Sequence, residues 1–370
     1  MGNTLITPTQ VANEALAILR SNLVYKNLVH TDFSAEFIPK VGATVNVRVP
    51  ASLTAQDFVQ GRNASAQDVT ETYVPVVLNR HKDVTVALTT QDKTLKIRDF
   101  AKQIIEPAVI PIAEAIDTDI AVKLYEKAGT YISGNSSSTD LTDIAGLVKK
   151  LDINKAPTGQ RSLVVGPEHK YRYIKLPNLS YNMNAGDDSA LRRADMGDVY
   201  GLRSYMSQLT PASSADTAGT LAAATYNVAS GTTNTVNISA ASLATGTYKI
   251  GDGFIYNGTI YRFTADGVLT SNAAANVATS PVFPANIASI AAVVLPSSSS
   301  LAFHRNALAL ATRTLELPEG AAKSAIADFE GISIRVVYDY DWKSKSDIIS
   351  FDVLYGVKEL RTGLITKLVG

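Results

Sequence analysis

The histidines are the first residues in this sequence that could bind a metal or act in catalysis. There are four, His30, His81, His169 and His304, and none has a second histidine at the two- to four-residue spacing of metal-binding motifs. The chain contains no cysteine. Zinc sites need clustered histidine, cysteine or carboxylate ligands. The sequence therefore predicts no zinc site and no cysteine nucleophile, and it favours imidazoles that lie at the surface or are hydrogen-bonded in a core.

Two groups of carboxylates could bind a hard cation or act as acid and base. Asp187 and Asp188 lie in a stretch with loop composition, and Asp339 and Asp341 flank a predicted strand turn, so solvated carboxylates are the better prediction in both places. No phosphate-binding loop, serine nucleophile elbow or zinc-protease motif is present. The sequence predicts a protein that is not an enzyme and needs no cofactor.

The balance of charge and the apolar runs exclude further classes of protein. Lys plus Arg and Asp plus Glu number 34 each. A chain with no net charge does not favour nucleic-acid binding through counterion release. The first residues lack the pattern of a secretion signal, and the longest apolar run, residues 290–295, is far shorter than the ~20 residues that cross a bilayer. We expect a soluble protein that is made in a cytoplasm.

The first hundred residues predict a helix, a strand and a long polar connection. A proline at residue 8 followed by apolar residues on one side predicts a helix that ends near Asn22, and alternating valines predict a strand over 45–49. Two more strands are expected around 73–78 and 84–88. The intervening residues 51–72 are polar, weakly patterned and too long for an ordinary loop. We expect an extended arm that becomes ordered on a neighbouring molecule.

The strongest helical pattern in the chain spans residues 99–128. Its apolar positions recur every three or four residues, which predicts one buried stripe along a long helix: Ile105, Val109, Ile112, Ile116, Ile120 and Leu124. Pro107 and Pro111 fall within this pattern, so we expect a kink or a new helix start there.

The rest of the chain mixes helices and strands without a regular repeat. A helix is expected from residue 140 to 151, a buried strand at 162–166, a helix from Pro167 to Lys175, and a second helix, rich in Ala and Leu, after Asn306. Two strands joined by a polar turn should close the chain. This order predicts an α+β fold rather than a doubly wound α/β fold.

Residues 211–300 stand apart because they contain almost no charge. Five charged residues occur there: Asp216, Lys249, Asp252, Arg262 and Asp266. The segment is rich in Ala, Ser, Thr, Gly and Asn, and Asn257-Gly258 lies between two alternating apolar runs, which is a strong hairpin signal. We therefore expect residues 211–300 to form a separate all-β domain that is inserted into a host domain with its two ends close together.

The order of these segments resembles a known family. The stretches VGATVNVRVP, HKDVTVALTTQDKTLKIRDFAKQIIEPAVIPIAEAID, GPEHKYRYIK, GDVYGLRSYMS, LAFHRNALALATRTLELP and DVLYGVKELRTG, with an insert before the fifth, are similar to tailed-phage major capsid proteins of the Hong Kong 97 fold. More narrowly, the chain resembles podovirus-type coat proteins that carry a telokin-like insertion domain. The resemblance extends from about Phe37 to Gly363.

The resemblance implies a division of the chain into parts. These are an N-terminal arm and helix (1–36), the extended loop with peripheral-domain strands (37–98), the spine helix of the peripheral domain (99–139), the first part of the axial domain (140–210), the inserted β domain (211–300), the second part of the axial domain (301–330) and the C-terminal peripheral strands (331–370). Charged residues in and around the polar arm are then the expected inter-subunit contacts: Arg48, Asp57, Arg62, Asp68, Glu71 and Arg80.

The implied partners are further copies of this chain, arranged as pentamers and hexamers of an icosahedral shell. A scaffolding protein, a portal and packaged double-stranded DNA bound without sequence specificity are also implied, with no membrane. Two alternatives remain open. A shell of the encapsulin nanocompartment type would hold cargo enzyme rather than DNA. A glycan-binding or adhesive β module on a helical carrier would need residues 211–300 alone to bind a glycan, which is unattractive because the one tryptophan, Trp342, lies outside that segment.

Overall fold

The computed structural model describes residues 8–31, 44–49, 60, 72–89, 104–133, 141–180, 193–211, 225–230, 235–240, 246–248, 250, 252–256, 259–269, 275–284, 290–293, 298–320, 323–329, 332–343 and 346–370. The chain forms two compact units. Unit 1 contains Met1–Lys26, His30–Ile116 and Leu308–Leu360, and unit 2 contains Asn27–Val29, Asp117–Ala307 and Arg361–Gly370.

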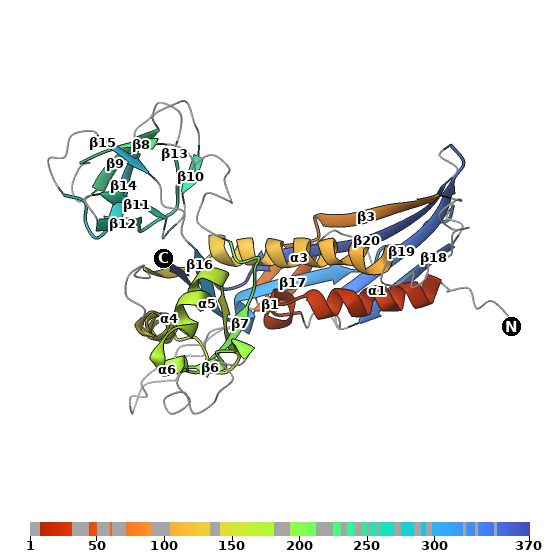
Figure 1. Ribbon diagram of the computed structural model, residues 1–370, viewed down its shortest axis with the longest axis horizontal. Helices are drawn as coiled ribbons and strands as arrows, with labels where there is room; N and C mark the ends of the chain where they lie inside the picture. The colour runs from red at the N-terminus through yellow and green to blue at the C-terminus, as the bar shows by residue number, and fades with distance from the viewer. Residues whose placement is uncertain are drawn as a thin grey trace. The chain divides into compact units, whose positions relative to one another are not determined.

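Unit 1 is built on a long antiparallel sheet. Its strands and helices are α1 (Pro8–Asn22), β1 (Thr44–Val49), β2 (Thr72–Val77), β3 (Arg80–Thr89), the first part of α3 (Glu106–Glu126), β17 (Leu308–Arg313), β18 (Lys323–Phe329), β19 (Ile332–Asp341) and β20 (Ser346–Glu359). The sheet order is β17-β20-β19-β18, and β3 also pairs with β20. Helix α1 packs on β18 and β19, as Figure 1 shows.

The long helix α3 has the buried stripe that the sequence predicts. All six apolar residues of the predicted stripe are at most 1% exposed. A π-helical turn at residues 104–105 precedes the helix. The helix starts at Glu106, so Pro107 lies in the first turn, where a missing N–H removes no hydrogen bond, while Pro111 lies inside the helix. The expected new helix start at Pro107 is therefore confirmed.

Unit 2 contains one sheet that mixes parallel and antiparallel pairs. Its order is β4-β21-β16-β5-β7-β6, with β21 parallel to β4 and β5 parallel to β7. Its elements are β4 (Thr130–Ser133), α4 (Thr142–Ile153), β5 (Arg161–Val165), α5 (Pro167–Ile174), α6 (Pro177–Ser180), β6 (Asp198–Val199), β7 (Leu202–Met206), β16 (Ser299–His304) and β21 (Ile365–Val369), with short 3-10 turns η1 (Tyr25–Leu28), η3 (Arg305–Ala307) and η4 (Thr362–Leu364). Helix α4 packs on β21 and β4.

The strands between residues 225 and 293 pair with one another. They are β8 (Thr225–Ser230), β9 (Thr235–Ala240), β10 (Gly246–Tyr248), β11 (Gly253–Tyr256), β12 (Thr259–Phe263), β13 (Gly267–Leu269), β14 (Ala275–Ser280) and β15 (Ile290–Val293). Six of them form a sheet in the order β11-β12-β14-β9-β8-β15, and β10 pairs with β13. The hairpin expected at Asn257-Gly258 is confirmed, because Tyr256 pairs with Thr259 across a two-residue connection.

The prediction of a helix after Asn306 is wrong. Residues 305–307 form a 3-10 turn, and Leu308–Arg313 form strand β17, which pairs along β20. Leu and Ala favour helices in isolation. Here the four residues from Leu308 to Ala311 are all buried, and a short apolar run that is buried on both faces is equally typical of an inner strand. Pairing with a distant strand has overridden local propensity.

The two compact units exchange segments in the last third of the chain. Residues 308–360 group with the long sheet of unit 1. Residues 361–370 supply β21 to the sheet of unit 2. The polar turn that precedes β20 was easily read from the sequence, but the change of unit at Leu308 and Arg361 carries no change in composition.

Candidate inter-subunit surface

The two strands β1 and β2, which lie on either side of the predicted polar arm in the sequence, form a two-stranded ribbon. The strands pair antiparallel, from Thr44 opposite Val77 to Val49 opposite Thr72, and most of the predicted arm, residues 51–72, lies outside the described residues. Successive strand residues point to opposite faces. Val76 is fully buried, whereas Tyr73 is 54% and Val77 is 47% exposed. The ribbon therefore has one buried face and one exposed face with apolar side chains on it.

The buried face of the ribbon rests on the long sheet of unit 1. Val47, Val76 and Leu78 pack in one apolar cluster with Ala309 and Ala311, and two leucines near the end of β20 border it. The ribbon comes close to β20 at Gly356, where a Cβ would overlap the carbonyl oxygen of Val77 and would lie 3.2 Å from the Cα of Leu78. Glycine inside a strand marks such an approach. Gly356 was a sequence signal that another part of the chain packs closely against this strand, and that signal was missed.

The six expected contact residues fall into two groups. Arg48 stands opposite Tyr73 in the register of the ribbon, and Arg80 begins β3, opposite Tyr355 of β20. The side chain of Arg80 is half-buried and interacts within its own chain. The remaining four, Asp57, Arg62, Asp68 and Glu71, lie outside the described residues. The structure thus locates two of the six, on the strands that flank the arm.

The basic run at residues 80–82 has an acidic partner in its own chain. The Nε2 atom of His81 is 3.8 Å from Oδ1 of Asp352. The same carboxylate accepts hydrogen bonds from Arg335 Nε at 3.0 Å and Nη2 at 2.7 Å, and from Ser350 Oγ at 3.1 Å. Because Asp352 is buried, these donors stabilise its charge. The imidazole of His81 therefore has an acidic neighbour within its own chain.

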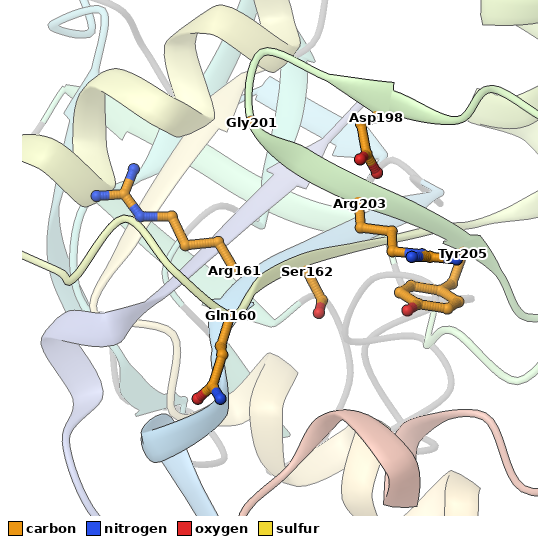
Figure 2. Close-up of a pocket in the computed structure, with 7 residues that line it drawn as sticks. All are labelled: Gln160, Arg161, Ser162, Asp198, Gly201, Arg203 and Tyr205. Carbon is orange, nitrogen blue, oxygen red and sulfur yellow. The ribbon is translucent and has the colours of Figure 1, made fainter.

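A small polar hollow lies beside the β6–β7 hairpin in unit 2. It has a volume of about 290 Å³ and is lined by Gln160, Arg161, Ser162, Asp198, Gly201, Arg203 and Tyr205. Figure 2 shows the guanidinium of Arg203 beside the ring of Tyr205, and the two are 5.9 Å apart. The hairpin turns at Tyr200 and Gly201, which both have positive φ, and the Tyr200 side chain is exposed. The tip of this hairpin therefore exposes an aromatic side chain, and its Gly201 lines the hollow.

The lining of this hollow is not arranged for catalysis. Figure 2 shows the guanidinium of Arg161 turned away from the other lining side chains. It donates to the carbonyl oxygens of Ala156 and Pro157 and lies 2.8 Å from Oδ1 of Asp152, so its role is to hold the preceding loop. The lining residues include no histidine beside Ser162 and one carboxylate, that of Asp198. A nucleophile with its base, or a carboxylate pair, is missing from this set.

His169 lies within hydrogen-bonding distance of two serines that are far from it in the sequence. His169 Nδ1 lies 2.7 Å from Ser300 Oγ, and its Nε2 lies 3.2 Å from Ser298 Oγ, which in turn donates to the carbonyl oxygen of Gly370. Both ring nitrogens are engaged, and the side chains of His169 and Ser300 are buried. Burial lowers the pKa of His169 to about 4. The group is closed to substrates and links α5 to β16 and to the residue that follows β21.

The described residues offer no other site for chemistry. Among them, no three His, Asp or Glu side chains are grouped closely enough to hold a metal ion. Asp339 and Asp341 accept hydrogen bonds from the backbone N–H groups of Tyr340 and Lys343, so they shape the turn between β19 and β20. Asp187 and Asp188 lie outside the described part. Within that part, every helix is too short or too polar to span a bilayer.

Comparison with solved structures shows where this fold occurs. The chain described as "Mycobacterium phage Che8" aligns with a TM-score of 0.54 and 16% identity over 94% of this chain and 90% of that one. The "Capsid structure of the Cyanophage P-SCSP1u" aligns with a TM-score of 0.50 and 13% identity over 94% and 87%. The "Capsid of empty GTA particle" aligns with a TM-score of 0.51 and 8% identity over 95% and 90%. No family model and no curated protein matches the sequence.

These alignments run along almost the whole length of both chains in each pair. The class of protein that they define is the Hong Kong 97-type capsid fold, the fold of tailed-phage major capsid proteins. The mixed α+β architecture that the sequence predicts, with its long helix, is confirmed as this fold.

Proposed function

We propose that this chain is the major capsid protein of a tailed bacteriophage. Copies of the chain, as pentamers and hexamers, build an icosahedral shell around double-stranded DNA, assembled in the host cytoplasm and kept in the virion. The observation that carries the proposal is the shared fold with a cyanophage capsid chain over 94% of this chain. The absence of an assembled catalytic group among the described side chains agrees with a structural role.

The ribbon supports this proposal independently of any comparison. A ribbon that is anchored on one face and exposes Tyr73 and Val77 on the other leaves apolar surface uncovered in a single copy. Exposed apolar surface near a long polar arm is typical of a surface that a partner covers. In a closed shell each copy covers its neighbour's ribbon, and every subunit repeats the same contact.

Several finer features belong to the same proposal. We propose that residues 211–300 form an inserted domain of the podovirus, telokin-like type, and that a scaffolding protein and a portal assist assembly. The six residues named above, from Arg48 to Arg80, are proposed as contacts between neighbouring copies. We propose for the parts 1–36, 37–98, 99–139, 140–210, 301–330 and 331–370 the roles that the resemblance gives them.

Electron microscopy of the purified protein tests the main proposal. Closed shells hundreds of ångströms across, with DNA inside when they are isolated from infected cells, are the expected result. Particles the size of one folded chain refute it. Shells filled with an enzyme instead of DNA would favour a nanocompartment, and glycan binding by single copies would favour an adhesive module.

A matched pair of variants tests the ribbon. Tyr73→Asp places a charge on the exposed face and is expected to leave the melting temperature unchanged while it prevents shell formation. Ile153→Asp changes another exposed apolar side chain, on α4, and is expected to leave assembly intact. If the two variants assemble equally well, the ribbon is not a contact between copies.

Hydrogen exchange tests the arm. The amides of residues 51–71 should exchange rapidly in free subunits and slowly in shells, because order there depends on a neighbour. Arg62→Glu should slow assembly more than it affects folding, since an exposed ion pair contributes only ~0 to 1 kcal/mol per copy but recurs in every subunit. Equal protection of the arm in both states would contradict its role.

A further inference from the structure

The segment that is poorest in charge places two of its charges where water does not reach. Asp252 is 1% exposed and Arg262 is 2% exposed, although residues 211–300 contain only five charged residues. Asp252 immediately precedes β11, and Arg262 lies in β12, which pairs with β11. A buried charge is costly unless it is paired and hydrogen-bonded. The two buried charged side chains of this hairpin therefore need polar or charged partners in the residues that pack against it.

Those partners come from two distant parts of the chain. The hydroxyl of Tyr125, near the end of α3, donates a hydrogen bond of 3.0 Å to Oδ1 of Asp252. The Nζ atom of Lys367, in β21, lies 3.8 Å from the centroid of the same tyrosine ring. Tyr125 and Lys367 are both fully buried. One aromatic ring thus contacts a carboxylate of the hairpin through its edge and a cation of the last strand through its face.

The electrostatics of Tyr125, Asp252 and Arg262 are mutually dependent. Burial, followed by the charge of Asp252, raises the pKa of Tyr125 well above its usual value, so the hydroxyl keeps the proton that it donates. Burial lowers the pKa of Arg262, and Tyr125, Tyr131 and Asp252 oppose that change. In a medium of low dielectric, removal of one group leaves the others without compensation.

A second line of contacts follows the same boundary. Tyr131 of β4 shares a hydrogen bond with Ser280, at the end of β14. Its neighbour Thr130 is joined to Thr366 of β21 by a hydroxyl contact of 2.8 Å. The backbone N–H of Phe263 also donates to the carbonyl oxygen of Asp252 at 2.7 Å, which fixes Asp252 against the end of β12.

The name buried joint is used here for the set Tyr125, Asp252, Arg262 and Lys367. We propose that the buried joint couples the docking of the β11–β12 hairpin to the closure of β21, so that the two are gained and lost together. The hairpin needs the Tyr125 hydroxyl to compensate the buried charge of Asp252. The lysine of β21 needs the face of the same tyrosine ring. If either the β11–β12 hairpin or β21 packed without the other, a charged side chain would be buried without compensation.

Hydrogen exchange measured on the full-length, unassembled chain tests the coupling. Asp252→Asn removes the one negative charge of the joint, and Tyr125→Phe, a milder change, removes a single hydroxyl. In both variants the amides of β11, β12 and β21 are expected to exchange faster together, by at least ~100-fold for Asp252→Asn. The amides of β7, elsewhere in the sheet of unit 2, should keep their wild-type rates. Tyr256→Phe removes a hydroxyl from the same hairpin outside the joint and is the matched control.

Three outcomes would overturn the proposal. Faster exchange in the hairpin with unchanged β21 would mean that the joint holds the hairpin without coupling it to the strand. Unchanged exchange in both would mean that the buried groups contribute nothing to docking. Equal acceleration in β7 would mean a general loss of stability. Because the chain is unassembled, the outcome is independent of whether it builds shells.

Discussion

Acidification should loosen the contact between α5 and the strands β16 and β21. His169 is buried between Ser298 and Ser300, and its pKa is lowered to about 4, first by burial and then by the nearby charge of Arg172. The unfolded chain binds the proton at the usual pKa of about 6.5. The stabilisation from His169 is therefore complete above pH 6.5, and it is lost progressively as the pH falls from 6.5 toward 4.

The size of the effect follows from these two values. Between pH 7.5 and pH 4.5, the difference in proton binding between the unfolded and folded chain amounts to about 2 to 3 kcal/mol of lost stability. That corresponds to opening of the region on the order of 100 times more often at the lower pH. His304 is also buried and has a lowered pKa, so it adds a smaller dependence of the same sign that remains when His169 is replaced.

Two measurements check this prediction. NMR titration of the imidazole signals, assigned with single His→Gln variants, should give His169 a pKa near 4 in the folded chain. Exchange rates of β16 and β21 amides, corrected for the intrinsic effect of pH, should rise on acidification in the wild type and much less in His169→Gln. His81→Gln, at an exposed side chain, should behave like the wild type. A titration of His169 near pH 6.5, or the same pH dependence in His169→Gln, refutes the reasoning.

Three further substitutions test the packing. Gly356→Ala should lower the free energy of unfolding by about 1 to 3 kcal/mol in urea titrations, because the new methyl group overlaps the ribbon backbone, whereas Gly363→Ala, with open space around it, should have little effect. Ile112→Asp should give insoluble protein, because it buries an unpaired carboxylate. Soluble protein that melts cooperatively would instead show that the buried stripe faces a partner. The control is Ile153→Asp, at an exposed position. Arg335→Met should cost about 3 to 5 kcal/mol by leaving its buried carboxylate partner without its main donor, and a loss below 1 kcal/mol in denaturant would contradict that account.

The sequence predicts well the elements that depend on local patterns. The helix of residues 8–22, the buried stripe of α3 and the hairpin at Asn257-Gly258 follow from periodicity and turn chemistry, and all three are present. The strand at Leu308 was mistaken for a helix because its partner, β20, lies more than 40 residues away. A local pattern carries no information on which distant strand will cover both faces of a short apolar run.

The contacts between distant side chains were beyond local prediction. His169 meets serines about 130 positions away, and Tyr125 meets Asp252 and Lys367, yet nothing near any of these residues marks them as partners. The low charge of residues 211–300 was visible in the sequence. That two of its five charged residues, Asp252 and Arg262, are buried follows only from the folded arrangement. Gly356 alone gave a local signal, as a glycine within a strand pattern.

The order of strands in unit 2 limits how early its sheet can form while the chain is being synthesised. Strand β4 ends at Ser133, but its neighbour β21 begins only at Ile365, and β21 also lies between β4 and β16 in the sheet. A ribosome that adds ~5 to 20 residues per second needs roughly 10 to 50 s to make the intervening chain. Throughout that interval β4 has no strand partner, and β16, once it has been made, lacks one of its two neighbours. A nascent chain therefore cannot complete this sheet until residues 365–369 have been translated.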